Sequence, residues 1–453
     1  MAAVQLKTVK FGGSSLADAA QFRKVKAIIE SDPGRCFVVP SAPGKRHSKD
    51  VKVTDMLYQC QQLAAEGKDF SQTLAQIRER YMEIANTLSV SFDPTAALEK
   101  IEADLKAGAS KDYAASRGEY LNGMLLSEYL GFPFVDAAEV VCFTEAGVFR
   151  MDDTMQKMRA RLKGLERAVV PGFYGATDDG RIITFSRGGS DVTGSLVARA
   201  TRSDIYENWT DVSGVLVADP RIVPDAAVIN TVTYEELREL SYMGATVLHE
   251  DAIFPVRAAG IPINIRNTNE PEAPGTFIVA DDSAESDVET GYTITGIAGK
   301  KGFCAINIQK AMMNAELGFC RKVLTVLEDN GISFEHMPSG IDTMTLILPE
   351  DAIRGKEKTV LSGIRKAVSP DRCEIEHGIS LLAVVGRGMR RTRGTAARIF
   401  AALAHARINI KMIDQGSSEL NIIIGLLDGD FEEAVRRIYE IFITGASVTV
   451  DED

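Results

Sequence analysis

The pattern of apolar and polar residues near the N-terminus predicts a parallel sheet. A short apolar run at 6–11 is followed by two glycines and two serines, and a helical pattern then runs from Ala17 to Glu30. Turn-forming residues at 31–34 end this helix, and a second apolar run follows at 35–40. Strand, glycine turn, helix and strand make a βαβ unit, the building block of parallel sheets.

The pattern changes after residue 55. Residues 55–112 are rich in Ala, Gln, Glu, Lys and Leu and lack strand signals, which predicts a helical lobe attached to the sheet. Strand signals then resume and alternate with helical patterns, at 132–135, 168–170, 181–185, 203–206, 215–217 and 263–265. The acidic polar stretch at 281–289 is typical of a solvated linker. We therefore expect a first α/β domain that ends near residue 290.

The last third of the chain contains an internal repeat, offset by 76 residues (379 against 303). The aligned pairs are 303–309 with 379–385, Met313 with Met389, Gly318 with Gly394, Ile332 with Ile408 and Gly340 with Gly416. Each copy has the βαββαβ order of a ferredoxin-like module. We expect the two modules at 291–372 and 373–453.

Length, charge and cysteine spacing exclude several classes of protein. The 453 residues carry 51 basic and 63 acidic side chains, a formal net charge of −12. Binding to nucleic acid or to an anionic membrane favours surplus Lys and Arg, so we expect neither partner. No apolar run approaches the roughly 18 residues of a membrane span, and the N-terminus lacks the apolar core of a secretory signal. Six scattered cysteines without Cys-x-x-Cys spacing indicate free thiols, no metal site and a cytoplasmic location.

The segment Lys10-Phe-Gly-Gly-Ser-Ser15 has the residues of a phosphate site. A lysine at the end of the first strand would point to the mouth of the sheet. Gly12 and Gly13 lack a Cβ, so their N–H groups can approach a phosphate closely. Ser14 and Ser15 would cap the following helix, whose N-terminus attracts anions. A plain strand-to-helix turn is the structural alternative, and the P-loop pattern is absent.

Two helix starts carry charged residues suited to a small amino-acid substrate. In the segment 186–193, Arg187 can hold a carboxylate through its planar guanidinium, and Asp191 lies at a predicted helix start. Glu119, in a segment predicted to open another helix, could face a substrate ammonium as a buried carboxylate. The structural alternatives are a capped helix with an exposed arginine and a glutamate that only favours the helix dipole.

A further segment places polar residues after a strand. Thr210 and Asp211 follow an apolar run, at the position where open parallel sheets bind ligands. Asp211 could accept a hydrogen bond from a nucleotide, and Arg221, after a proline-containing turn, could reach phosphate oxygens. Two ordinary surface turns are the alternative.

Together these segments resemble the aspartokinases of the amino acid kinase family. The matching motifs are KFGGSS at 10–15, GE at 118–119, SRGGSD at 186–191, TDVSGV with ADPR at 210–221, and GATVLH at 244–249. The segments at 386–389 and 409–418 resemble the second of two C-terminal ACT modules. The likeness spans nearly the whole chain and implies a three-layer αβα sandwich at 1–290, with a mostly parallel sheet, followed by the two modules. Such modules can interleave, in which case strand 303–309 would complete the second one.

The resemblance also implies an activity, the phosphorylation of the β-carboxylate of L-aspartate by ATP. The product, 4-phospho-L-aspartate, leads to lysine, threonine and methionine. The implied catalytic residues are Lys10 and Asp191. The implied aspartate ligands are Ser41, Thr54, Glu119 and Arg187. The implied nucleotide ligands are Lys10, Gly12, Gly13, Thr210, Asp211 and Arg221, with Mg²⁺ bound through the ATP phosphates. The β-carboxylate is ionised at pH 7 because its pKa is about 4, so no general base is needed.

The sequence departs from the family pattern at Thr246, where many members have a lysine that contacts the nucleotide. Threonine cannot supply that charge, so Arg221 or Lys10 alone would have to suffice. Two alternatives to the kinase stay open for this reason. One is an amino-acid sensor with an inactive or altered kinase domain, and the other is a sibling kinase for another small carboxylate.

The resemblance finally implies feedback inhibition by an end-product amino acid. The first ACT module would supply the effector site, at Met313, Phe319, Ser333 and Glu335. A carboxylate such as Glu335 could pair with a ligand ammonium, which favours lysine as the effector and leaves threonine open. Pairing of the modules implies a homodimer or homotetramer, and the alternative is that the modules serve only this assembly.

Overall fold

The computed structural model describes residues 4–186, 188–245, 248, 250–280 and 293–445. The chain forms two compact units. The first comprises Met1–Val215, Asn230–Tyr234 and Val247–Val288, and the second comprises Leu216–Ile229, Glu235–Thr246 and Glu289–Asp453. Two short pieces of the first 290 residues therefore belong to the second unit.

The centre of the first unit is a seven-stranded sheet with the order β3-β2-β1-β6-β8-β9-β7. Its strands are β1 (Lys7–Phe11), β2 (Arg35–Pro40), β3 (Ala168–Val169), β6 (Ile205–Thr210), β7 (Thr231–Thr233), β8 (Ile263–Asn267) and β9 (Thr276–Val279). All neighbours are parallel except β8 and β9. The chain winds in one direction from β1 to β3 and in the other from β1 to β6. The carboxyl ends of β1 and β6 therefore form a topological switch point, where open α/β sheets bind ligands.

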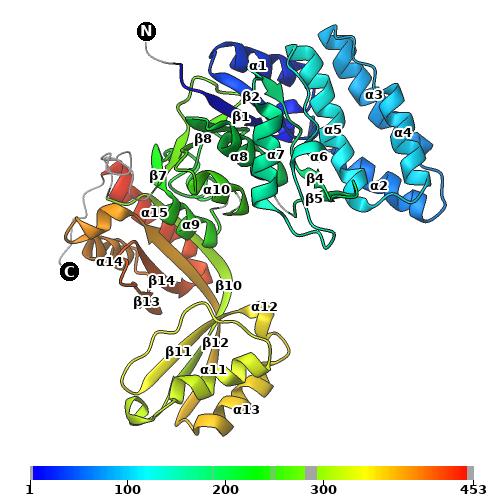
Figure 1. The fold of residues 1–453 in the computed structure, drawn as a ribbon. Helices are drawn as coiled ribbons and strands as arrows, with labels where there is room; N and C mark the ends of the chain where they lie inside the picture. The colour runs from blue at the N-terminus through cyan, green and yellow to red at the C-terminus, as the bar shows by residue number, and fades with distance from the viewer. Residues whose placement is uncertain (1–3, 187, 246–247, 249, 281–292, 446–453) are drawn as a thin grey trace. The chain divides into compact units, whose positions relative to one another are not determined.

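Helices cover both faces of this sheet (Figure 1). They are α1 (Ala19–Glu30), α5 (Lys111–Leu130), α6 (Ala137–Val140), α7 (Met151–Leu162), α8 (Gly189–Thr201) and α10 (Glu250–Arg257). Successive side chains of a strand point to opposite faces. Val38 accordingly packs in the core with α1 and α5, while Phe37 and Val39 pack in the core with α7 and α8. The α/β fold with a mostly parallel central sheet, as the sequence predicts, is confirmed.

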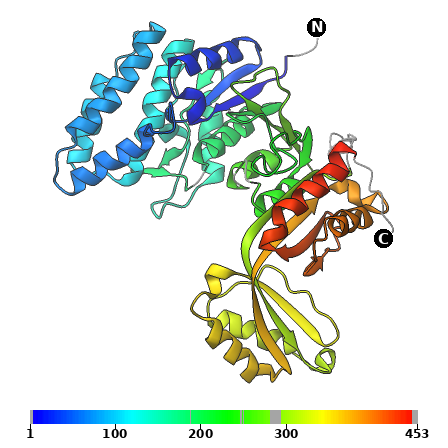
Figure 2. The same cartoon turned by 180° about the vertical axis from the view of Figure 1, so that it is seen from behind.

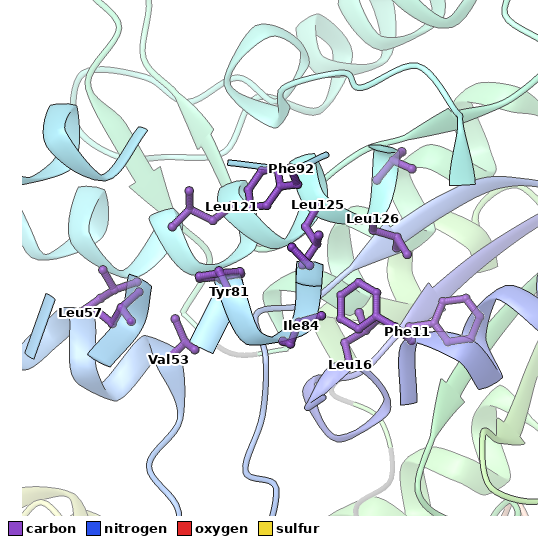
Figure 3. Close-up of a cluster of buried hydrophobic side chains, with 14 of the residues drawn as sticks. Phe11, Leu16, Val53, Leu57, Tyr81, Ile84, Phe92, Leu121, Leu125 and Leu126 are labelled. Atoms are coloured by element: carbon purple, nitrogen blue, oxygen red, sulfur yellow. The ribbon is translucent and has the colours of Figure 1, made fainter. Parts of the chain in front are cut away.

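Three helices form a lobe beside α5, namely α2 (Val53–Ala65), α3 (Ser71–Leu88) and α4 (Thr95–Lys106). Figure 3 shows part of the cluster that joins this lobe to the sheet, in which Leu57, Tyr81 and Ile84 meet Leu121 of α5 and Phe11 of β1. Leu57, Tyr81 and Leu121 are fully buried. A small hairpin of β4 (Tyr174–Ala176) and β5 (Ile182–Thr184) completes the strands of this unit.

The second unit is built on a five-stranded antiparallel sheet with the order β11-β10-β12-β14-β13. The strands are β10 (Gly296–Gln309), β11 (Thr343–Pro349), β12 (Arg372–Val385), β13 (Met412–Asp414) and β14 (Asn421–Leu427). The long strands β10 and β12 run through both halves of the sheet (Figure 1). In one half, residues 303–309 of β10 pair with β11 and with the start of β12. In the other half, residues 296–300 pair with the end of β12, which also pairs with β14.

The internal repeat is visible as two equivalent helices, α11 (Phe319–Asp329) and α14 (Thr395–His405). Each follows a glycine in the left-handed conformation, with φ of 74° at Gly318 and 83° at Gly394. Only glycine adopts such an angle without steric cost, which explains why both copies keep it. In the same unit, α13 (Glu357–Val368) packs beside α11, and α15 (Phe431–Tyr439) packs beside α14 (Figure 2).

Two further helices belong wholly or mainly to the second unit, α9 (Tyr234–Tyr242) and α12 (Glu350–Ile353). Among the described helices of both units, none combines the length and apolar character needed to cross a membrane.

Candidate functional site

Lys10 lies in a buried polar cluster near the carboxyl end of β1. Its Nζ is 2.6 Å from Oδ1 of Asp191 and 3.3 Å from Oδ1 of Asn208. Asn208 also donates a hydrogen bond from Nδ2 to Oδ1 of Asp191, over 2.9 Å. Asp191 stands in the first turn of α8, where the helix dipole favours a negative charge. The structure thus brings Lys10 and Asp191, the two residues that the motifs single out for catalysis, into direct contact.

Asn208 is a member of this cluster that the sequence analysis missed. It is the β6 residue that pairs with Lys10 in the parallel register, and it is buried. Strands of a covered parallel sheet are normally apolar, so a polar amide in their interior is unusual. The sequence Ile-Tyr-Glu-Asn-Trp-Thr of β6 contains that signal, which could have marked Asn208.

The glycine pair before Asp191 is explained by backbone geometry. Gly188 precedes α8 with φ of 56°, in the left-handed region. A Cβ on Gly189 would lie 2.5 Å from Cδ2 of Phe173, which is too close for any side chain. Both glycines are therefore needed to bring the start of α8, and with it Asp191, against the sheet.

A cavity of about 520 Å³ opens at the carboxyl ends of β1, β2 and β6, beside the switch point. It is lined by Gly12, Gly13, Ser14, Ser41, Ala42, Pro43, Gly44, Lys45, Lys52, Thr54, Glu119, Thr210 and Asp211. This set includes nucleotide ligands implied by the motifs, Gly12, Gly13, Thr210 and Asp211. It also includes three of the implied aspartate ligands, Ser41, Thr54 and Glu119. Residues from three separate strand ends and from the two helices α2 and α5 are thus gathered around one space.

Two glycine turns meet backbone to backbone in the cavity wall. The N–H of Gly44 donates to the carbonyl of Gly13 over 2.8 Å. A Cβ on Gly13 would lie 2.8 Å from the carbonyl oxygen of Ala42, and a Cβ on Gly44 would lie 2.6 Å from the carbonyl carbon of Gly13. At Gly12, by contrast, a Cβ would make only ordinary contacts at 3.6 Å. Packing therefore requires glycine at 13 and 44. Gly12 has room for a side chain, and its N–H donates to the carbonyl of Trp209 over 3.0 Å, so this N–H is not free for a phosphate as the sequence analysis expects.

The helix after the first glycine turn begins later than predicted. Residues 13–16 form a 3-10 turn, and α1 begins only at Ala19. The side chain of Asp18 caps α1, and neither Ser14 nor Ser15 does so. The prediction that these serines cap the helix is wrong, because the 3-10 turn intervenes and an aspartate, a strong N-cap residue, follows it.

Glu119 lies in the interior of α5, and the prediction that its segment opens a helix is wrong. The helix begins at Lys111, where the Ser110 side chain caps it, so Glu119 comes more than two turns later. Its carboxyl group is buried, and one oxygen, Oε2, has no hydrogen-bond partner in the described residues. Burial raises the pKa of Glu119 to about 8, although a backbone hydrogen bond from Ala42 and the nearby Arg117 oppose the shift. Because an ammonium would favour the ionised form of this group, the position suits a cationic ligand.

Three residues that the sequence analysis discusses for the site cannot be located relative to the cavity. Arg187 and Thr246 lie outside the described residues. Arg221 belongs to the second unit, where its guanidinium is largely exposed and lies 2.5 Å from a carboxylate oxygen of Asp219. The nucleotide role of Arg221 and the aspartate role of Arg187 stay predictions.

The predicted effector residues have contrasting surroundings. Met313 and Phe319 are buried in the hydrophobic core of the first module. Ser333 is exposed, and the carboxylate of Glu335 accepts a hydrogen bond from the hydroxyl of Tyr242. Their role in effector binding stays a prediction.

Comparison with known proteins bears directly on this arrangement. Residues 5–267 match the model of the amino acid kinase family, and residues 382–442 match an ACT domain model. The chain is 40% identical to Aspartokinase 3 of Bacillus subtilis, over 98% of this chain and 100% of that protein. The chain belongs to the aspartokinases. The resemblance drawn from the motifs is therefore confirmed.

Solved aspartokinase structures agree with this assignment. The crystal structure of Clostridium acetobutylicum aspartate kinase is 51% identical and superposes with a TM-score of 0.88, covering 97% of this chain and 100% of that one. E. coli aspartokinase III, in complex with aspartate and ADP, is 24% identical with a TM-score of 0.68, covering 96% of this chain and 99% of that one. The E. coli enzyme shows that the fold is shared.

Proposed function

We propose that this chain is an aspartate kinase, which transfers the γ-phosphoryl group of ATP to the β-carboxylate of L-aspartate. The products are ADP and 4-phospho-L-aspartate, on the route to lysine, threonine and methionine. The observation that supports this most directly is the cavity at the switch point, whose walls combine the nucleotide residues with the aspartate residues. Relatives of this chain are named as aspartokinases or aspartate kinases, and the structure of the E. coli relative was solved in complex with aspartate and ADP.

For this phosphoryl transfer the protein has to position the two substrates and neutralise their charge, and little else. The β-carboxylate is already a nucleophile at neutral pH, so no base has to remove a proton. Lys10, held by Asp191 and Asn208, is directed toward Gly12, since its Nζ lies 3.6 Å from the Cβ position of that residue. An ammonium at this place would neutralise the phosphoryl oxygens as the group is transferred.

The substrate ammonium has a matching place at Glu119. Its Oε2, which has no partner in the part of the chain that the structure describes, can accept a charged hydrogen bond, and the ammonium would supply a counter-charge for the buried carboxyl. Ser41 and Thr54 stand on the same wall and can donate hydroxyl hydrogen bonds to aspartate. Arg187 would hold the α-carboxylate, which completes the recognition of an α-amino acid.

The nucleotide would bring Mg²⁺ on its own phosphate oxygens. Within the described residues, no three His, Cys, Asp or Glu side chains are grouped as a metal site. Asp211 in the cavity wall is suited to contribute a single carboxylate, in keeping with the preference of Mg²⁺ for phosphate, water and few protein ligands. Bound there, the ion would neutralise charge on the phosphates.

The activity is tested by incubating the full-length protein with ATP, Mg²⁺, L-aspartate and hydroxylamine. Aspartyl hydroxamate is the expected product, because hydroxylamine traps acyl phosphates. Glutamate, succinate and β-alanine serve as acceptor controls, and recognition of both α-groups predicts little product from the last two. Absence of hydroxamate at high protein concentration would refute the kinase and favour the amino-acid sensor, whereas product only with another acceptor would favour the sibling kinase.

We further propose feedback inhibition through the ACT modules, with lysine as the first effector to test and threonine as the second. The E. coli relative was solved with lysine and aspartate in its T-state, which supports this choice. A homodimer or homotetramer and a cytoplasmic location belong to the same proposal, and the six free cysteine thiols fit a reducing compartment. Inhibition assays with lysine and threonine, singly and together, test the effector.

A further inference from the structure

The loop between β2 and α2 carries cations that the roles above do not use. Lys45, Arg46, Lys49 and Lys52 all lie in this short segment. Two of them, Lys45 and Lys52, line the cavity beside Glu119 and the first glycine turn. Both are exposed, and within the described residues neither has an ion-pair or side-chain hydrogen-bond partner.

Two arginines around this loop, Arg46 and Arg80, are paired with Asp50. Arg46 Nε lies 3.0 Å from Asp50, and Arg80 NH1 lies 2.8 Å from the same carboxylate. Hydrogen bonding from Arg46, with Arg80 nearby, holds the pKa of Asp50 well below its usual range. Asp50 is therefore committed to two arginines, and it does not neutralise Lys45 or Lys52.

The loop is also held firmly against the first glycine turn. Arg80 is buried and donates hydrogen bonds to the carbonyls of Gly44 and Ala17. The N–H of Gly44 in turn donates to Gly13. Lys45 follows this anchored glycine directly, so its backbone has a fixed position beside the first glycine turn. Lys52 lies at the other end of the loop, where its carbonyl accepts the N–H of Met56 in the first turn of α2.

The proposed reaction needs more positive charge than Lys10 supplies. Lys10 already faces Asp191 at 2.6 Å, and Asp211 adds a carboxylate to the cavity wall. ATP and aspartate are both anions that must come into contact, so their mutual repulsion has to be offset by positive charge. Compact ammonium groups on flexible stems are well suited to bind phosphate and carboxylate oxygens.

We propose that Lys45 and Lys52 bind anionic oxygens of the reacting substrates in the cavity. This inference rests on the proposed kinase activity and adds two binding residues to it. The loop thereby forms a cationic wall of the cavity that Thr210 and Asp211 also line, and Arg80 anchors this loop through the carbonyl of Gly44.

The test uses full-length protein and the variants Lys45→Met, Lys52→Met and their double. Lys49→Met is the matched control, since Lys49 is an exposed lysine of the same loop that does not line the cavity. We expect kcat/KM to fall about tenfold for each single change and about a hundredfold for the double, with the control within about twofold of wild type. Lys45→Arg and Lys52→Arg should restore much of the loss, and unchanged thermal melting should accompany every variant because both side chains are exposed.

Three readouts identify the oxygens that are bound. Weaker binding of ADP, measured by calorimetry, assigns the lysines to the nucleotide phosphates. A higher KM for aspartate with unchanged ADP binding assigns them to the substrate carboxylates. A lower kcat alone assigns them to the phosphoryl group in transfer. Wild-type kinetics and ADP binding in the double variant would overturn the inference.

Failure of the inference is distinguishable from failure of the kinase. If the wild type forms no aspartyl hydroxamate, the proposed activity fails, and titrations of ADP and aspartate then decide on the lysines. Equal affinities of wild type and double variant for both ligands would overturn the inference in that case, and weaker binding by the double variant would support it.

Discussion

Two buried glutamates of the first unit lie in opposite electrostatic surroundings. Glu207 on β6 accepts hydrogen bonds from Nε of Arg35 and Nε1 of Trp209, each over 2.8 Å, and lies 3.4 Å from Nζ of Lys7. Glu119 on α5 is also buried, but its Oε2 has no hydrogen-bond partner among the described residues and its pKa is raised to about 8. A buried charge is costly unless it is paired. The ion pairs of Glu207 hold neighbouring strands of the sheet together. The carboxylate of Glu119, in contrast, can pair with a cationic group of a ligand.

The largest expected effect comes from removing Glu207, the carboxylate that is paired with cations. Glu207→Ala would leave Arg35 and Lys7 without their buried partner, and we expect the free energy of unfolding of the first unit to fall by about 3–5 kcal/mol. Urea unfolding followed by Trp209 fluorescence measures this change. The exposed Glu79→Ala is the control and should stay within about 0.5 kcal/mol of wild type. A similar small change for Glu207→Ala would mean that the ion cluster contributes little.

Glu119→Gln should have the reverse profile, a large effect on activity and almost none on stability. Loss of a charged hydrogen bond to the substrate ammonium would lower kcat/KM for aspartate by about a hundredfold. ADP affinity should stay unchanged, and the unfolding free energy should stay equal or rise because the amide carries no ionisable group into the interior. Steady-state kinetics and urea unfolding of the same preparation test both halves. If stability fell as it does for Glu207→Ala, the two glutamates would not differ in the way described.

The contrast also predicts proton release on aspartate binding. With a pKa of about 8, Glu119 is about nine-tenths protonated at pH 7 in the free protein. A bound ammonium lowers that pKa, so the proton leaves and aspartate affinity should rise up to about tenfold per pH unit between pH 6 and 8. Calorimetric titration in buffers of different ionisation enthalpy measures the released proton. Glu119→Gln should abolish both the release and this pH dependence, and their persistence would assign them to another group.

The sequence predicts this difference only in part. Glycine pairs, Lys10 and Asp191 are found at strand ends and helix starts, where position along the chain largely determines position in the sheet. The degree to which a carboxylate is paired cannot be found in this way, because Arg35 and Lys7 reach Glu207 from two other strands.

That the loop between β2 and α2 lines the cavity could not be predicted from the sequence, for a related reason. The direction of Lys45 depends on an irregular loop that a distant residue, Arg80 of α3, holds in place. The start of α1 differs from the prediction because a 3-10 turn precedes the helix. The periodicity of apolar residues does not distinguish such a turn from the helix. Regular elements are thus predictable from the pattern of side chains, while loop supports and charge pairing depend on tertiary contacts.

The smallest expected effect separates two neighbours on one strand. Asn208 follows Glu207, yet its side chain faces Lys10 and Asp191 on the other side of the sheet. Asn208→Ala removes a hydrogen bond that orients Asp191, so kcat should fall by about five- to tenfold while the unfolding free energy changes by about 1 kcal/mol. The measurement is kcat at saturating ATP and aspartate, beside urea unfolding. Asn208→Asp sharpens the test, because a second carboxylate beside Asp191 would compete for Lys10 and should lower kcat further at neutral pH. If Asn208→Ala lost as much stability as Glu207→Ala and kept its kcat, Asn208 would serve to stabilise the fold, as Glu207 does, and would not orient Asp191.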